Sequence, residues 1–241
     1  ISEQIDEARW RYYVLDDPTM SDADFDTRMR RLEALEDEFP ESANGAVPRA
    51  VPVRFGTWVG GDRDGNPFVT PSESIAAARR ASYAILGRYH ETLGDLVGRV
   101  SVSSRLAPPS AELMASLDAD RAVLPDVWAE NSRRNADEPI RLKLTFMAAR
   151  IDATRRVVAA RDAGRPFDEP AAYPAADAFR DDLQLVRASL LSAGATETCR
   201  AVVDPLVAGL EAHGWHGELM DVRDHADVHA AAILEIAERL E

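Results

Sequence analysis

Residues 54–67 form the densest group of chemically capable side chains in the sequence, Arg-Phe-Gly-Thr-Trp-Val-Gly-Gly-Asp-Arg-Asp-Gly-Asn-Pro. The glycines permit positive φ angles and close backbone approach, and Pro67 stiffens the exit of the loop. Such a loop can hold polar and aromatic side chains at one concave place, as binding sites on loops require. The candidates are Trp58, Asp62, Arg63, Asp64 and Asn66.

Two other interpretations of this loop stay open. Asp62, Asp64 and Asn66 have the alternate spacing of a calcium-binding loop. Glu73 stands at the twelfth position of that pattern, but Pro67 occupies the sixth, which the calcium loop reserves for glycine. The same glycine-rich run is also compatible with a structural turn that binds nothing.

A second group of polar side chains lies at residues 213–229. The pattern predicts a short buried strand that leads into a helix. His225 and His229 stand four residues apart, the spacing of two metal ligands on one helix face, with Asp221 nearby as a third. The alternatives are histidines on a solvated helix face and an Arg223 that forms an ordinary salt bridge with a neighbouring aspartate.

Several elements must position these two groups. Residues 1–43 are rich in acidic side chains and predict a helical hairpin, and residues 44–52 have the composition of a linker. Residues 53–241 predict a helix-rich region with few short strands, expected near 53–58 and 219–223. The fold class is therefore mainly α, with the strands near the two candidate groups.

Helix boundaries follow from capping signals in the second region. Thr70-Pro71-Ser72-Glu73 supplies an N-cap, a proline at N1 and an N3 carboxylate, and we expect that helix to end at Gly98. Ile75 is predicted to open its buried stripe. Further helices are expected at 110–117, at 139–163 and along the apolar stripes of Phe179 and Leu206, whereas residues 118–137 are expected to be irregular.

Charge and hydropathy exclude some classes of protein. The sequence has 42 acidic against 28 basic residues, a formal net charge of −14, which disfavours nucleic-acid binding over the chain as a whole. No apolar run approaches the roughly 18 residues that a membrane span needs. The chain starts at Ile1 with neither an initiator Met nor a signal peptide, so we expect a trimmed or excised chain of a cytoplasmic protein.

Two residue types occur once each and limit the chemistry. Cys199 has no second cysteine for a disulfide or a thiolate cluster, and we expect it to be a buried, inert thiol. Lys143 is the only lysine and so the only candidate for lysine chemistry. Arginine carries nearly all the remaining positive charge, and its planar guanidinium makes bidentate contacts to phosphate.

Both candidate groups resemble one family. Residues 55–67 resemble the phosphoenolpyruvate carboxylase signature, which reads nearly Phe-Gly-Thr-Trp-Met-Gly-Gly-Asp-Arg-Asp-Gly-Asn-Pro, and residues 213–224 resemble its Phe-Gly-Phe-His-x-x-x-Leu-Asp-Val-Arg-Gln. The resemblance covers about residues 47–241 and implies part of a helix-rich α/β-barrel enzyme. That enzyme converts phosphoenolpyruvate and bicarbonate to oxaloacetate and phosphate on Mg²⁺ or Mn²⁺.

The resemblance also implies roles for single residues. Trp58 falls on the bicarbonate side, Arg63 among the substrate-binding residues, and Arg223 on the phosphate. Asp224 stands where the family has Gln, and an acid at this place implies a weaker phosphate site. The loop frame implied by the resemblance is Gly60, Gly61, Asp62, Asp64, Gly65 and Asn66.

Other parts of the family pattern are not found in this sequence. The catalytic His of its Thr-Ala-His-Pro-Thr motif, its metal carboxylates and its glycine-rich mobile loop have no counterpart here. We therefore expect no complete catalytic set and no bound Mg²⁺ or Mn²⁺ in this chain, and no carboxylation by the chain alone. A homo-oligomer stays open.

Residues 11–26 resemble a different family, the N-terminal Ia domain of NAD-dependent DNA ligase, which binds the nicotinamide mononucleotide half of NAD. Lys143 is not followed by the x-Asp-Gly that ligase adenylation requires, so ligase chemistry is excluded. Two resemblances that meet at a linker suggest a fusion or an engineered chimera. A hairpin that merely packs, or a scaffold protein, is the alternative. The nucleotide contacts implied are Tyr12, Tyr13, Asp22, Phe25 and Asp26, of which Tyr13 and Phe25 depart from the family's His and Tyr.

Overall fold

The computed structural model describes residues 20–21, 24–25, 27–28, 30–31, 54–165 and 167–240. The chain divides into two compact units, Ile1–Val47 and Pro48–Glu241. In the first unit the described residues between 24 and 31 are helical, and Ser21 Oγ accepts a hydrogen bond from the Asp24 N–H at 3.2 Å, as an N-cap does. The rest of the predicted hairpin lies outside the described residues.

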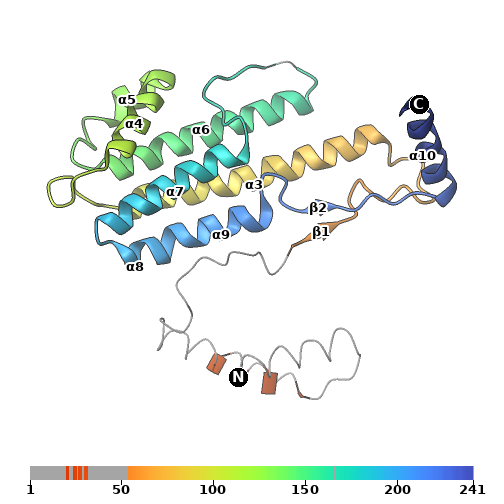
Figure 1. Ribbon diagram of the computed structural model, residues 1–241, viewed down its shortest axis with the longest axis horizontal. Helices are drawn as coiled ribbons and strands as arrows, with labels where there is room; N and C mark the ends of the chain where they lie inside the picture. The colour runs from red at the N-terminus through yellow and green to blue at the C-terminus, as the bar shows by residue number, and fades with distance from the viewer. Residues whose placement is uncertain are drawn as a thin grey trace. The chain divides into compact units, whose positions relative to one another are not determined.

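The second unit is mainly helical, as the sequence predicts (Figure 1). Its strands are β1 (Gly56–Thr57) and β2 (Leu219–Met220). Its helices are α3 (Pro71–Arg99), α4 (Ala111–Val123), α5 (Pro125–Asn131), α6 (Pro139–Asp162), α7 (Ala176–Ser192), α8 (Thr196–Thr198), the π-helix η2 (Cys199–Val203), α9 (Asp204–His213) and α10 (Ala226–Leu240). None of these described helices is long and apolar enough to cross a membrane.

Helix α3 begins where the capping signal predicts. The Thr70 side chain accepts a hydrogen bond from the Glu73 N–H, and Pro71 occupies the first turn. The helix ends at Arg99, one residue beyond the predicted Gly98, and the Val100 N–H still donates to the Leu96 carbonyl. The N-cap therefore fixes the beginning of α3 directly after the glycine-rich loop.

Helix α6 packs along α3 and also contacts α4, α5 and α7 (Figure 1). The predicted stripe of α7 is buried against α6, and the stripes of α7 and of η2–α9 are buried against each other. The predicted stripe of α3 is wrong at its first member, because Ile75 is 52% exposed. Arg79 already reaches the carbonyl of Arg161 at the end of α6, so the first turns of α3 extend past the helix that would cover them.

The prediction of an irregular stretch at residues 118–137 is also wrong. Helix α4 continues to Val123, and Pro125 opens α5 at its N1 position. Proline fits this position because the first turn needs no N–H donor. The polar composition of the stretch reflects the exposed faces of two short helices.

Lys143 lies in a buried charge network. Its Nζ is fully buried and donates to Asp120 at 2.7 Å and to Asp182 at 2.6 Å. Arg150 lies 3.3 Å from the other oxygen of each carboxylate, and its guanidinium stacks 3.9 Å over the ring centroid of Tyr173. Burial raises the pKa of Asp120, and Lys143 opposes that shift. The only lysine is thus fully engaged as a structural ion pair.

Candidate functional site

The two candidate groups, residues 54–67 and 213–229, are far apart in the sequence but are joined by a ladder of backbone hydrogen bonds. Strands β1 and β2 pair in parallel, with Gly56 opposite Leu219 and Thr57 opposite Met220. Beyond the strands, the Arg223 N–H donates to the Gly61 carbonyl, and the Arg63 N–H donates to the Arg223 carbonyl, both at 2.9 Å. The ladder therefore holds the backbone of Arg223 on both sides.

The chain leaves the ladder between Thr57 and Gly61 in a turn that carries Trp58. The N–H groups of Gly61 and Asp62 both donate to the Trp58 carbonyl, at 2.9 and 3.2 Å. Gly60 has a φ of +77°, and a Cβ there would lie 2.6 Å from the Cβ of Ala77 on α3. The turn is thereby pressed against the first turns of α3.

Gly61 is needed for a different reason. A Cβ at this position would lie 2.2 Å from the carbonyl oxygen of Asp221, a distance that no side chain tolerates. Any larger residue would push β2 away from the loop. The close backbone approach expected for the glycine-rich loop is therefore found at Gly60 and Gly61.

Trp58 and Arg223 form the exposed face of this arrangement. The Arg223 guanidinium carbon lies 5.2 Å from the centroid of the Trp58 ring, within the range of a cation–π interaction. Trp58 is 59% exposed. In residues 54–165 and 167–240 Arg223 has no ion-pair partner, and Asp224 Oδ1 instead accepts the backbone N–H of His225 at 2.8 Å. The salt-bridge interpretation of Arg223 gains no support, and its guanidinium keeps donors for a ligand.

Arg63 is directed toward α3. Its Nη2 donates to Ser74 Oγ at 2.9 Å, and the Ser74 hydroxyl donates to the Gly60 carbonyl at 2.5 Å. Arg63 Nε and Asp62 Oδ1 are buried with no hydrogen-bond partner among the described residues. The sequence analysis missed Ser74, because a serine in the first turn of a helix resembles many others and only the folded loop brings it next to Gly60.

The other polar residues of the loop make local contacts. Asn66 Oδ1 accepts the Phe68 N–H at 3.1 Å, which closes a turn, and Asp64 Oδ1 lies 3.2 Å from His225 Nε2. The part of the chain that the structure describes contains no group of three His, Cys, Asp or Glu side chains arranged to hold a metal. Neither the calcium-loop nor the histidine-pair interpretation gains support.

The predicted buried strand is exposed. Leu219 is 45% exposed and Val222 is 51% exposed. In the described part of the chain the sheet has two strands. Phe55 at its beginning stacks on His213, with ring centroids 5.6 Å apart. The apolar residues here reflect an open sheet edge.

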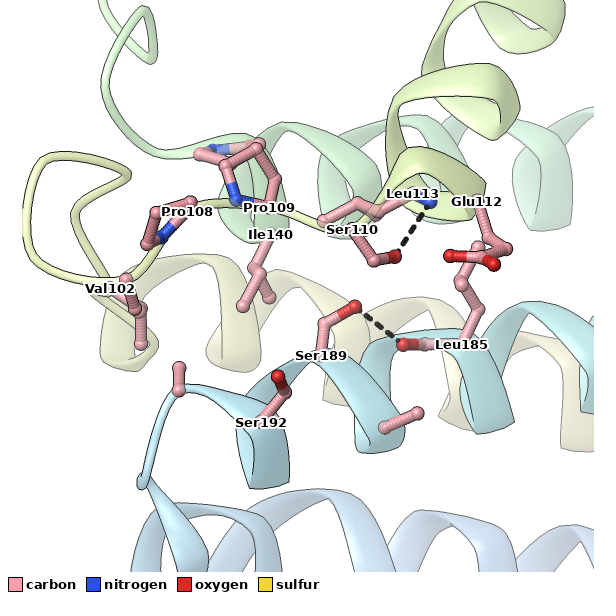
Figure 2. A pocket seen from close by; sticks show the side chains of 14 residues that line it. Val102, Pro108, Pro109, Ser110, Glu112, Leu113, Ile140, Leu185, Ser189 and Ser192 are labelled. Atoms are coloured by element: carbon pink, nitrogen blue, oxygen red, sulfur yellow. Dashed lines mark hydrogen bonds between the residues drawn. The ribbon is translucent and has the colours of Figure 1, made fainter.

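The described residues of the second unit line at least three hollows, one of which, of about 430 Å³, lies between α3 and η2–α9. A cavity of about 400 Å³ flanks the ladder, between β2 and the small side chains of α3, with Arg80, His216 and Glu218 among its polar lining. A pocket of about 270 Å³ lies between the start of α4 and α7 (Figure 2). There Ser110 Oγ accepts the Leu113 N–H and Ser189 Oγ donates to the Leu185 carbonyl, so both hydroxyls are used within the helices.

Cys199 is buried, as predicted. Burial and the neighbouring Asp204 carboxylate raise the pKa of its thiol to about 11, which disfavours the reactive thiolate. Of the nucleotide contacts expected in the first unit, Tyr12, Tyr13, Asp22 and Asp26 lie outside the described residues. Phe25 is half-buried in the helical segment.

The sequence model of the family described as "Phosphoenolpyruvate carboxylase" matches residues 3–241. Curated relatives with the name phosphoenolpyruvate carboxylase include those of Synechocystis sp., 33% identical over 97% of this chain, and Xanthomonas oryzae pv. oryzae, 38% identical over 81%. A third, from Ralstonia nicotianae, is 37% identical over 82%. The chain spans 22%, 20% and 20% of these three relatives, about a fifth of their length.

Proposed function

This chain belongs to the phosphoenolpyruvate carboxylase family, and we propose that it supplies the phosphate-binding part of a site for phosphoenolpyruvate. The reaction we propose for the whole protein is that of the family, phosphoenolpyruvate and bicarbonate to oxaloacetate and phosphate. In that reaction the phosphoryl group passes from the enol oxygen to bicarbonate. The enolate carbon then bonds to the carboxyl carbon derived from bicarbonate, whose bond to the phosphate oxygen breaks so that phosphate leaves. The contribution of this chain is to bind and orient the anionic substrates.

The observation that carries this proposal is the free guanidinium of Arg223. Its backbone is held on both sides by Gly61 and Arg63, while its side chain lies over Trp58 with no ion-pair partner among residues 54–165 and 167–240. A planar guanidinium with unused N–H donors matches the oxygens of a phosphate. Trp58 limits the directions that this guanidinium can take and lies on the bicarbonate side of the proposed site.

Arg63 has a different role in this proposal. Its guanidinium donates to Ser74 and its N–H pairs with the Arg223 carbonyl, so it supports the position of Arg223 more than it offers donors to a substrate. Asp62, Asp64, Asn66 and the loop glycines form the frame. We therefore assign direct phosphate contact to Arg223 alone.

The divalent metal of the family does not fit the residues that the structure describes. Asp62 Oδ1 is the one buried carboxylate oxygen beside the ladder without a partner among these residues, and a Mg²⁺ site requires more oxygen ligands than this one. No step at Arg223 depends on a metal in this proposal. We expect the 241-residue chain alone to form no oxaloacetate, and a coupled malate dehydrogenase assay checks this.

Titration with phosphoenolpyruvate and with inorganic phosphate tests the proposal on the whole chain. Isothermal calorimetry should detect binding of both, and Arg223→Ala should weaken it at least about tenfold, as expected for a lost charge-assisted hydrogen bond. Arg134→Ala is the matched control, because Arg134 is exposed in the turn after α5, at the other end of the second unit from β1 and β2 (Figure 1). Equal affinity in the two variants would reject the assignment.

For residues 1–43 we propose weak binding of nicotinamide mononucleotide, which rests on the sequence resemblance of residues 11–26 alone. The match to the carboxylase family extends over residues 3–43 as well, so it gives no support to a separate nucleotide-binding origin for this segment. Tyr12→Ala should abolish chemical-shift changes on addition of the nucleotide. Unchanged spectra of the unmodified chain at millimolar nucleotide would eliminate this proposal.

A further inference from the structure

The Ser74 hydroxyl connects helix α3 to two residues of the loop, Gly60 and Arg63. The residue lies in the first turn of α3 and is 9% exposed. Its Oγ donates to the Gly60 carbonyl at 2.5 Å and accepts from Arg63 Nη2 at 2.9 Å. Gly60 ends the turn that carries Trp58, and the N–H of Arg63 pairs with Arg223. The hydroxyl therefore lies between the supports of both members of the Trp58–Arg223 pair.

A serine in a helix commonly donates to the carbonyl four residues earlier, which here belongs to Thr70. Ser74 Oγ lies 3.3 Å from that carbonyl but only 2.5 Å from the carbonyl of Gly60. A hydroxyl has one hydrogen to donate, and the shorter contact takes it. The local helix contact is thus secondary, and the bond to the loop is the principal one.

The geometry around Gly60 explains why this bond forms. The positive φ of Gly60 and its lack of a Cβ let the turn approach Ala77 and present its carbonyl to α3. The low exposure of Ser74 keeps water from replacing the contact. Without the hydroxyl, both the Gly60 carbonyl and the Arg63 guanidinium would lose a partner at a protected place.

We propose that Ser74 is a positioning residue that holds Trp58 beneath the Arg223 guanidinium and so prepares the anion site. The inference rests on the proposed function only for the ligand, because the positioning of the Trp58 ring can be measured without one. Ser74 touches no substrate in this proposal. It acts through the Gly60 carbonyl on one side and through Arg63 on the other.

The ligand-free experiment measures the fluorescence of Trp58. Each variant is paired with the same variant carrying Trp58→Phe, and the difference spectrum isolates Trp58 from the other tryptophans. Arg223→Ala removes the stacked guanidinium, so it gives the reference emission maximum and iodide quenching for an unstacked Trp58 ring. Ser74→Ala should shift the Trp58 component to the Arg223→Ala values, whereas Ser74→Thr, which keeps the hydroxyl, should retain those of the unmodified chain.

Ser72→Ala is the matched control for loss of a serine hydroxyl. Ser72 is exposed in the same helical turn, and its Oγ contacts only the side chain of Thr70 at 2.7 Å among the described residues. This variant should leave the Trp58 component unchanged. An unchanged signal in Ser74→Ala, or an equal shift in Ser72→Ala, would overturn the proposal.

The binding arm uses inorganic phosphate and phosphoenolpyruvate. Ser74→Ala should weaken both about tenfold, and Ser74→Thr should restore the affinity. If the unmodified chain binds neither anion, the proposed function fails while the fluorescence arm still decides the role of Ser74. If Ser74→Ala loses its far-ultraviolet circular dichroism, the variant is unfolded and Arg63→Met replaces it in the experiment. A Trp58 fluorescence component that Arg63→Met leaves unchanged counts against the proposal.

Discussion

The bundle core and the ladder edge use positive charge in opposite ways. In the core, Lys143 is fully buried between Asp120 and Asp182, and Arg150 lies against both carboxylates. At the edge, Arg223 lies over an exposed Trp58 and has no ion-pair partner in the described part of the chain. A buried cation must be neutralised by carboxylates within the fold, whereas an exposed cation is hydrated and can bind an anionic ligand.

This difference separates scaffold from site. The core charges orient α4, α6 and α7 relative to one another, because each of these helices contributes at least one member of the network. The edge residues are positioned chiefly by backbone hydrogen bonds, and the Arg223 side chain stacks on Trp58 without an ion-pair partner among the described residues. Substitutions in the core should therefore change stability, and those at the edge should change binding.

The largest effect is expected for Lys143→Met. This substitution leaves two buried carboxylates with Arg150 as their remaining cation and the Tyr173 hydroxyl as a donor to Asp182. Removal of one partner from a buried ion pair costs about 3–5 kcal/mol of unfolding free energy. Urea denaturation followed by circular dichroism measures the loss. The triple variant with Asp120→Asn and Asp182→Asn removes the unpaired charges and should recover part of it. A single variant within about 1 kcal/mol of the unmodified chain would contradict the buried network.

Gly61→Ala should have the next largest effect, mostly on the edge. Its Cβ would lie 2.2 Å from the Asp221 carbonyl oxygen, so β2 and the loop must separate, at a cost of about 2–3 kcal/mol. Phosphate binding should be lost together with the ladder, as calorimetry can measure. Gly94→Ala is the control, because it lies within α3 with nothing near its Cβ and should gain about 0.5–1 kcal/mol.

The free energy of unfolding should depend on pH through the buried thiol of Cys199. The pKa of Cys199 is raised from 9.0 to about 11, so between these values the folded chain keeps a proton that the unfolded chain loses. Stability should thus fall as pH rises from 9 toward 11, by about 2 kcal/mol for this group. Tyr89 and Tyr173, whose pKa values are also raised by burial, add a similar trend. Cys199→Ala isolates the thiol, because it should show a shallower loss over this range.

The smallest effect is expected for His225→Gln. The pair of His225 and Asp64 at 3.2 Å is exposed at both members, and such pairs contribute about 0.2–1 kcal/mol when charged. A double-mutant cycle with Asp64→Asn, measured by urea denaturation, should give a coupling free energy at the low end of this range. A coupling above about 2 kcal/mol would show that side-chain pairing, as well as the backbone ladder, holds the edge together.

Much of the helical framework could be predicted from local signals. The Thr70 cap and Pro71 mark the start of α3, and the stripe that begins at Phe179 is buried along α7. The prediction for Ile75 is wrong because the first turns of α3 extend past α6, and the prediction for α5 is wrong because the polar composition there reflects the exposed faces of short helices. Periodicity reports which side chains are apolar, but it does not report whether a partner covers them.

The sequence by itself determined which residues could form the site, since the glycine-rich loop and the segment around Arg223 both stand out in it. Only the tertiary structure decided that they meet, because Gly61 and Arg63 pair with Arg223 through backbone groups that carry no side-chain signal. It also decided that Arg63 donates to Ser74, whereas Arg223 lies over Trp58 and has no ion-pair partner among the described residues. Arg63 and Arg223 differ in role because their partners are set by long-range packing, which the local sequence does not encode.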